Sequence, residues 1–236
     1  MERILSELVD RLVKTHGEGL LSVVLYGSAA TPDGKDQMSD FNVLCVLRRI
    51  SPDELEASEP VFRWWREMKN PAPLLMTLEE LRTCTDCFPI EFHDIRERHR
   101  ILLGEDLVTP LEIDDSFYRA EVEHELRAKL LRLRQKAGGV LHERDLLLRL
   151  MAGSVSTFCV LFRHALRLFG QAPQFNKRDV IDSARQRFGI DPAPFLTLID
   201  VREGKAKLTQ VQTKALFAAY LQQIGTVIAA VDQIEK

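Results

Sequence analysis

The amino-terminal half of the chain alternates between short apolar runs and amphipathic stretches, so strands and helices are interspersed there. The runs 20–26 and 41–47 are short and largely apolar, as buried strands are, and a third strand is expected over 73–77. Residues 88–95 alternate apolar and polar side chains, which predicts a one-sided strand, and 100–108 adds an edge strand or a turn. Before these, helical spacing of apolar residues predicts an opening helix through Ile4, Leu5, Leu8, Val9 and Leu12.

Capping residues mark where two further helices begin. Residues 51–54 have the capping-box pattern with a proline at the first helical position, so a helix should start there. Thr77 and Glu80 repeat the capping pattern before a brief helix. Pro60 is expected to kink or divide the first of these helices, because a proline removes one backbone hydrogen bond.

The second half of the chain reads as helical throughout. Long helical patterns cover 116–137 and 142–169, and Asn176 and Thr209 are predicted caps of two later helices. The first of the long patterns is basic towards its end, which predicts a solvated face or a contact with a nucleotide or another anionic partner.

The change of pattern predicts an α+β protein with two domains. A mixed-sheet domain is expected over residues 1–112 and an all-α helical domain over residues 113–236. The second domain should close one side of a cleft. A homodimer formed through this domain is an alternative that the sequence does not decide.

Composition narrows the classes of protein. With 236 residues, 45% hydrophobic and 28% charged, the chain has the composition of an average soluble protein. A net charge of -3 gives no overall attraction to polyanions, so nucleic acid is not expected as a partner. The start of the chain lacks a signal-peptide core, and no uninterrupted apolar run approaches the ~20 residues of a membrane span. A cytoplasmic protein without a membrane partner is expected.

The cysteines do not form a disulfide framework in a chain of this size, and we expect them to be reduced. Cys84 and Cys87 make a single C-x-x-C pattern without a matching second pair. Ordinary thiols are therefore expected there rather than a zinc site, even with His93 nearby.

The clearest chemistry lies in the stretch 25–42. The strand over 20–26 leads into a turn at Gly27 and Ser28. At such a turn a backbone without a side chain can approach phosphates, and amide N–H groups and a hydroxyl can donate hydrogen bonds to them. The turn therefore suits a triphosphate.

A second group of polar residues begins the next strand, with Asp40, Phe41 and Asn42 in sequence. Because side chains alternate along a strand, positions 40 and 42 should face the same side while Phe41 faces the core. Two oxygen ligands would then converge beside the phosphates.

This arrangement resembles the polymerase-β nucleotidyltransferase superfamily, whose pattern is Gly-Ser, a loop, and then Asp-hydrophobic-Asp. Its layout is similar to that of the aminoglycoside nucleotidyltransferases, in which a mixed α/β catalytic domain precedes a helical domain. The superfamily has a third carboxylate on a later strand, and Glu91 in Pro-Ile-Glu-Phe is the best match. Asn42 departs from the pattern, which has aspartate there. The resemblance covers residues 20–105 well and the rest in outline.

The resemblance implies a nucleoside triphosphate, a hydroxyl acceptor, and Mg²⁺ or Mn²⁺ as cofactor. Asp40 would be catalytic and hold the metal together with Asn42 and Glu91. Glu91 would ligate the metal or accept the proton of the acceptor hydroxyl, and Gly27 and Ser28 would bind the terminal phosphates. Carboxylate-bound Mg²⁺ suits this chemistry because it neutralises charge at the phosphates.

Asn42 keeps an oxygen for coordination but removes a full negative charge from the expected site. Asp33 and Asp36 in the adjoining loop are candidates to compensate for it. Asp94 is the rival to Glu91, but three positions along a strand should place it on the opposite side.

Two hypotheses of function follow. In the first, the protein moves a nucleoside monophosphate from Mg-NTP to a hydroxyl of a small molecule or a protein. In the second, motivated by Asn42, it binds nucleotide or regulates another protein and has lost efficient transfer. A structural protein that dimerises through its helical half is a third and weaker alternative. The acceptor and the preferred base stay open.

Overall fold

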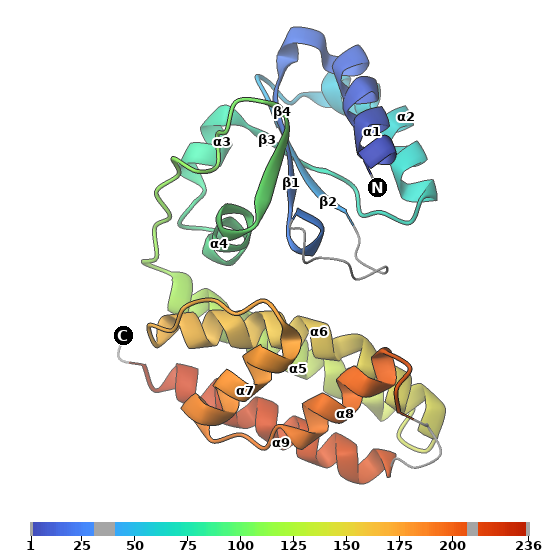
Figure 1. Cartoon of the computed structure of the whole chain (residues 1–236), viewed down its shortest axis with the longest axis vertical. Helices are drawn as coiled ribbons and strands as arrows, with labels where there is room; N and C mark the ends of the chain where they lie inside the picture. Colours follow the sequence, from blue (N-terminus) through green and yellow to red (C-terminus); the bar gives the residue numbers. More distant parts are fainter. Residues whose placement is uncertain (1, 31–40, 207–211, 235–236) are drawn as a thin grey trace. The chain divides into compact units, whose positions relative to one another are not determined.

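A computed structural model of the chain describes residues 2–30, 41–206 and 212–234. The chain divides into two compact units, Met1–Phe117 and Tyr118–Lys236 (Figure 1). The first unit contains a four-stranded sheet and helices, and the described part of the second is helical. The α+β class predicted from the sequence is confirmed.

The sheet of the first unit is mixed and has the strand order β3-β2-β1-β4. Its strands are β1 (Leu20–Tyr26), β2 (Asn42–Leu47), β3 (Leu74–Thr77) and β4 (His99–Gly104). The central strand β1 pairs antiparallel with both β2 and β4, while β2 pairs parallel with β3. Four strands therefore lie where apolar runs predict them, and the stretch from residue 99 forms one of the two edge strands.

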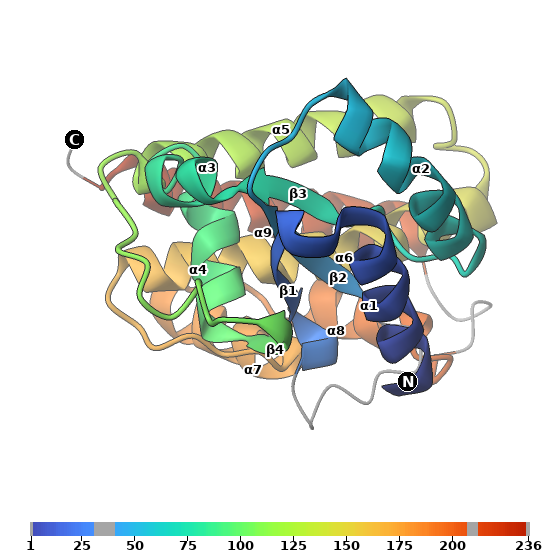
Figure 2. The same ribbon diagram turned by 90° about the horizontal axis from the view of Figure 1, so that it is seen from above.

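Helices cover both faces of this sheet (Figure 1; Figure 2). Helix α1 (Glu2–His16), which a short turn η1 (Gly17–Gly19) follows, lies with α2 (Pro52–Glu67) on one face. Helices α3 (Leu78–Thr83) and α4 (Pro89–Glu97) lie on the other face. The core of the first face includes Leu8, Leu12, Val23, Leu25, Cys45 and Trp65. The core of the second face includes Val24, Leu44, Val46, Leu81, Phe92 and Ile95.

The predicted caps of α2 and α3 are confirmed. Ser51 and Thr77 each accept a backbone hydrogen bond inside a complete capping box. The sequence suggested that Pro60 kinks or divides helix α2. The helix is not divided there and continues to Glu67. Val61 and Trp65, in the turns after the proline, are buried in the core, and this packing offsets the missing backbone hydrogen bond.

The strand predicted over residues 88–95 is wrong, because the segment forms helix α4. Pro89 occupies the first turn, where its missing N–H removes no helical hydrogen bond. The buried side chains include Ile90 with His93, and Phe92 with Ile95, both at the i, i+3 spacing of one helix face. Alternation of apolar residues over a few positions fits this pattern as well as it fits a strand.

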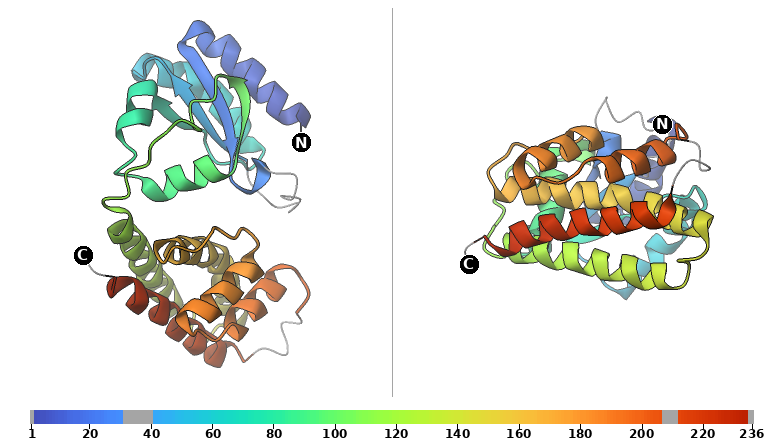
Figure 3. Two further views of the ribbon diagram at one scale, coloured as in Figure 1. Left: turned by 60° about the vertical axis from the view of Figure 1, so that its left-hand side comes forward. Right: turned by 90° about the horizontal axis from the view of Figure 1, so that it is seen from below.

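The second unit is a helix bundle with α5 (Tyr118–Gly138), α6 (Arg144–Leu168), α7 (Lys177–Phe188), α8 (Ala193–Arg202) and α9 (Thr213–Asp232). Helices α5, α6 and α9 pack against one another, and α7 and α8 pack on α6 (Figure 3). The aromatic residues at its centre include Phe158, Phe162, Phe195 and Tyr220.

The caps predicted for this half have different outcomes. The side chain of Asn176 accepts a hydrogen bond from the Arg178 amide at 2.9 Å and caps α7, as predicted. Thr209, the other predicted cap, lies outside the described residues. Helix α9 begins after Gln212, whose side chain makes no capping bond.

Two described helices, α6 and α9, are long and apolar enough to cross a membrane by length and composition alone. Core helices of globular proteins pass the same test. Both helices bury apolar side chains within the bundle, so their apolar character has an explanation inside this unit.

Candidate functional site

Gly27 and Ser28 lie at the turn that follows β1, where the sequence predicts them. Gly27 has a positive φ of 80°, a conformation that glycine adopts without steric cost. Ser28 begins a single 3-10 turn, η2 (Ser28–Ala30), and the Ala30 amide donates to the Gly27 carbonyl at 3.1 Å. The Ser28 residue is exposed, so its hydroxyl is accessible to a ligand.

The Gly27 amide does not fit the expectation that it donates to a phosphate. It donates instead to the Arg98 carbonyl at 2.9 Å. Arg98 is the C-cap residue that follows helix α4, and its own amide donates to the Asp94 carbonyl at 3.2 Å. These two hydrogen bonds join the end of α4 to the Gly27 turn through the backbone.

Asn42 lies directly beside this turn. It is the first residue of β2 and pairs with Tyr26, the last residue of β1. A Cβ atom placed on Gly27 would lie 3.3 Å from the Asn42 side-chain nitrogen. The amide group of Asn42 is therefore next to the backbone that is expected to meet phosphates.

The alternation predicted around Asn42 is seen for its described neighbours. Phe41 packs on the core of the α1–α2 face, with its ring centroid 6.0 Å from that of Trp65. Leu44, two positions after Asn42, lies in the core of the α3–α4 face. Because side chains alternate, Asn42 belongs to the α3–α4 face.

The other predicted ligands of this stretch fall where the structure gives no description. Asp40 lies outside the described residues, and so do Asp33 and Asp36. Asp40 therefore stays a prediction from the sequence.

Glu91 lies on α4 and not on a strand, and this changes its relation to Asp94. Glu91 is an exposed residue in the first turn of the helix. Residues three apart on a helix share one side of it, so Glu91 and Asp94 lie on the same side. The inference that Asp94 faces away from Glu91 is therefore wrong, because it rested on the period of a strand.

Both carboxylates act on Tyr26. Burial of the half-buried phenol raises its pKa above the ordinary value, and the negative charges of Glu91 and Asp94 raise the pKa further. Tyr26 precedes Gly27 and pairs with Asn42. One end of the sheet thus brings together the glycine turn, the amide of position 42, a phenol and two carboxylates.

Sequence reasoning missed Tyr26 and set Asp94 aside. A signal for helix α4 was present, because Pro89 stands at the first position of the helix, as Pro52 does in α2. A helix here would have placed Asp94 on the same side as Glu91. Tyr26 carries no such signal, because a tyrosine at the end of an apolar strand is ordinary.

The described residues at this end of the sheet offer oxygen donors for a metal ion. Within residues 2–30, 41–206 and 212–234, no group of three or more His, Cys, Asp or Glu side chains is placed to hold a metal ion. Asn42, Glu91 and Asp94 offer amide and carboxylate oxygens, which are the donors that Mg²⁺ prefers.

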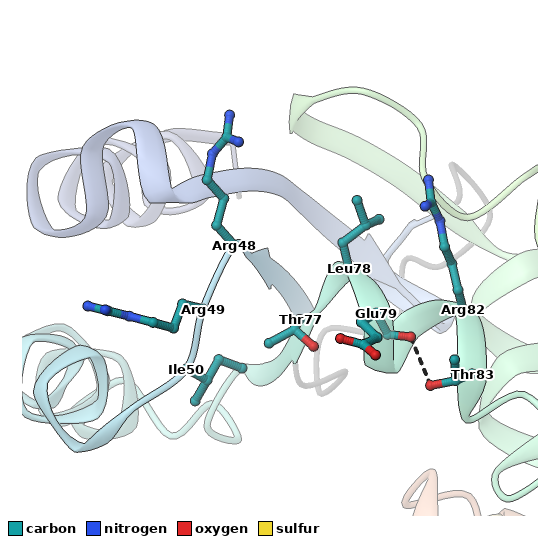
Figure 4. A pocket seen from close by; sticks show the side chains of 8 residues that line it. All are labelled: Arg48, Arg49, Ile50, Thr77, Leu78, Glu79, Arg82 and Thr83. Atoms are coloured by element: carbon teal, nitrogen blue, oxygen red, sulfur yellow. Dashed lines mark hydrogen bonds between the residues drawn. The ribbon is translucent and has the colours of Figure 1, made fainter.

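A surface hollow of about 510 Å³ lies at the opposite end of the sheet (Figure 4). Arg48 and Arg49, which follow the far end of β2, line it together with Arg82 of α3. The Arg48 Nε donates to the Glu18 carbonyl at 2.9 Å, and Arg49 forms an ion pair with Glu54 at 2.7 Å. Two of the three guanidinium groups are thus already bound within the protein, and the hollow is distant from the Gly27 turn.

No protein-family model matches the chain, and no curated protein sequence matches it. Among solved structures, the spectinomycin adenyltransferase AAD(9) from Enterococcus faecialis, determined with ATP and spectinomycin, is similar to it. The TM-score is 0.63 at 13% sequence identity, over 94% of this chain and 99% of that chain. The chain therefore shares the fold of this adenyltransferase over nearly its whole length.

Proposed function

We propose that the protein is a nucleotidyltransferase that moves a nucleoside monophosphate from an NTP to a hydroxyl group. The observation that carries the proposal is the position of Asn42 and the exposed Ser28 beside the Gly27 turn, with Glu91 and Asp94 on the adjoining α4. The adenyltransferase fold supports it. The acceptor is a small molecule or a protein, and the co-structure of AAD(9) with spectinomycin favours a small molecule.

The proposed reaction makes and breaks one bond at phosphorus. The acceptor oxygen bonds to the α-phosphorus, the bond to the bridging oxygen breaks, and pyrophosphate leaves. Glu91 accepts the proton of the acceptor hydroxyl, as a positioned general base does. The Ser28 hydroxyl donates to a terminal phosphate, and the Ser28 and Ala29 amides replace the Gly27 amide that Arg98 binds.

Mg²⁺ or Mn²⁺ is the proposed cofactor, with Asp40, Asn42 and Glu91 as the residues that hold it. The oxygen donors of Asn42 and Glu91 fit such an ion. When bound, it neutralises charge on the phosphates. We place the protein in the cytoplasm, without nucleic acid or membrane as a partner.

Asn42 supports a second candidate function. At position 42 the side chain beside the glycine turn is a neutral amide, and nearby carboxylates of α4 are retained. A protein that binds a nucleotide as a regulatory signal needs the turn that binds the phosphates. It does not need the full negative charge of the metal ligands that transfer requires. In that case NTP binding persists and transfer is slow or absent.

Ser28→Ala is expected to weaken Mg-NTP binding by ~1–2 kcal/mol, the usual range for one hydrogen bond to a charged group. The residue is exposed, so the substitution should not disturb the fold. Calorimetric titration of wild type and variant, each with and without Mg²⁺, measures the difference. An unchanged affinity in the variant would place the nucleotide elsewhere.

Glu91→Gln is expected to lower transfer by about a hundredfold or more, since a general base contributes roughly 10²–10⁴ in rate. Asp94→Asn is the matched change on the same side of α4. It should lower transfer less than about tenfold, because a residue that is not the general base does not cause the larger loss. Both replacements keep the side-chain shape. Turnover measured at saturating NTP compares them, and a larger loss in Asp94→Asn would assign the base to Asp94.

A further inference from the structure

The turn between α3 and α4 brings two cysteines together. Cys84 is the C-cap residue that follows α3, and the Cys87 amide donates to the Cys84 carbonyl at 3.1 Å. Such a four-residue turn brings its first and last Cα atoms within ~7 Å of each other. A disulfide needs Cα atoms about 4.4–6.8 Å apart, so the backbone already has nearly the separation that a Cys84–Cys87 bond requires.

The four cysteines differ in their accessibility. Cys87 is exposed and Cys84 is partly exposed, whereas Cys45 and Cys159 are 0% and 3% exposed. Burial raises the pKa of the Cys45 and Cys159 thiols to about 12, which leaves almost no reactive thiolate near neutral pH. Thiol chemistry in this protein is therefore concentrated in the α3–α4 turn.

A zinc site does not account for this pair. Structural zinc takes four ligands, and among the residues with described positions no group of three or more His, Cys, Asp or Glu side chains gathers. His93, the nearest histidine in sequence, is buried and its Nε2 lies 2.6 Å from Asp115.

We propose that Cys84 and Cys87 are a redox-modification site that forms a reversible intramolecular disulfide with a low-molecular-weight disulfide as oxidant. The Cys87 thiolate attacks one sulfur of the oxidant, a mixed disulfide forms, and one small thiol leaves. The Cys84 thiolate then attacks the Cys87 sulfur and releases the second thiol. Two cysteine thiols are oxidised by two electrons, and the small disulfide is reduced to two thiols.

The position of the pair links this chemistry to α4. The Phe88 amide also donates to the Cys84 carbonyl, at 3.2 Å, and Pro89 begins the helix directly after it. A covalent bond across the turn constrains the start of the helix that carries Glu91 and Asp94. The disulfide is detected as a covalent product, so its test does not depend on the proposed nucleotidyl transfer.

The test equilibrates the full folded chain in glutathione buffers of increasing oxidised fraction. The chain is then unfolded in denaturant so that buried thiols react too, the remaining thiols are blocked with iodoacetamide, and the peptides are mapped by mass spectrometry. We expect the wild type to lose both alkylation sites of the turn together and to gain a Cys84–Cys87 crosslink, while Cys45 and Cys159 stay reduced. Reducing buffer should reverse the change.

Single variants separate the steps. In Cys84→Ser, Cys87 has no second thiol to resolve it, so a glutathione adduct should accumulate there; Cys45→Ser is the matched control and should behave as wild type. A wild-type chain that stays fully alkylated at every ratio would overturn the proposal. A stable glutathione adduct on wild-type Cys87, or a disulfide between two chains, would overturn it as well.

Discussion

Asn42→Asp is expected to tighten Mg²⁺ binding by up to roughly a thousandfold. At an effective dielectric of ~20, a charge pair ~4 Å apart is worth about 4 kcal/mol, and every 1.4 kcal/mol corresponds to about tenfold in affinity. Asparagine and aspartate have nearly the same volume. The side chain of residue 42 is close to Gly27, since a Cβ atom built on Gly27 would lie 3.3 Å from the Asn42 side-chain nitrogen. Because the volume does not change, the aspartate should fit in the same space.

Metal affinity alone does not decide what the asparagine is for, so transfer is measured beside it. If transfer has been lost with the charge, it should rise in Asn42→Asp. If the wild type is an active enzyme adapted to asparagine, the added charge repels Asp40 and Glu91 and turnover does not improve. Asn42→Ala, which removes the side-chain oxygen, is the control and should gain neither. Equal metal affinity of wild type and Asn42→Asp would contradict the placement of a metal at position 42.

Gly104→Ala is expected to lower the free energy of unfolding by more than about 3 kcal/mol, beyond what a backbone conformation alone costs. Gly104 has φ of 79°, and a Cβ there would lie 2.0 Å from the Leu21 carbonyl oxygen. Leu21 lies near the start of β1, an inner strand of the sheet, so the clash must displace the backbone of an inner strand.

Gly17→Ala is the matched control for this change. Gly17 is in the same unit and has φ of 51°, but a Cβ there meets nothing within 4 Å. It should lose only the cost of the left-handed conformation, roughly 1–2 kcal/mol. Chemical denaturation of both variants measures the difference. Equal losses would show that the contact with Leu21 is relieved without cost.

Much of the fold could be predicted because local signals agreed with one another. The opening helix has one apolar stripe, the strands are short apolar runs, and the helices at 52 and 78 have capping boxes. The Gly27 turn could be placed because a strand ends there at a glycine. Each of these signals is contained in a few neighbouring residues.

Helix α4 could not be predicted by the same means, because its short apolar pattern fits two periods. Ile90 and Phe92, with the polar Glu91 between them, alternate as in a strand, while the buried His93 belongs only to the helical pattern. Once the period was wrong, Asp94 was placed on the wrong side. Tertiary contacts, such as the Arg98 carbonyl that binds the Gly27 amide, leave no mark in the sequence.

Nucleotidyl transfer from α-labelled NTP tests the central claim most directly. The wild type and Asp40→Ala are each incubated with Mg²⁺ or Mn²⁺, and labelled metabolite or protein is then sought. The account predicts metal-dependent labelling of a hydroxyl-bearing acceptor by the wild type and its loss in Asp40→Ala. An absence of metal-dependent NTP binding in both wild type and Asn42→Asp would contradict the account, including its regulatory alternative.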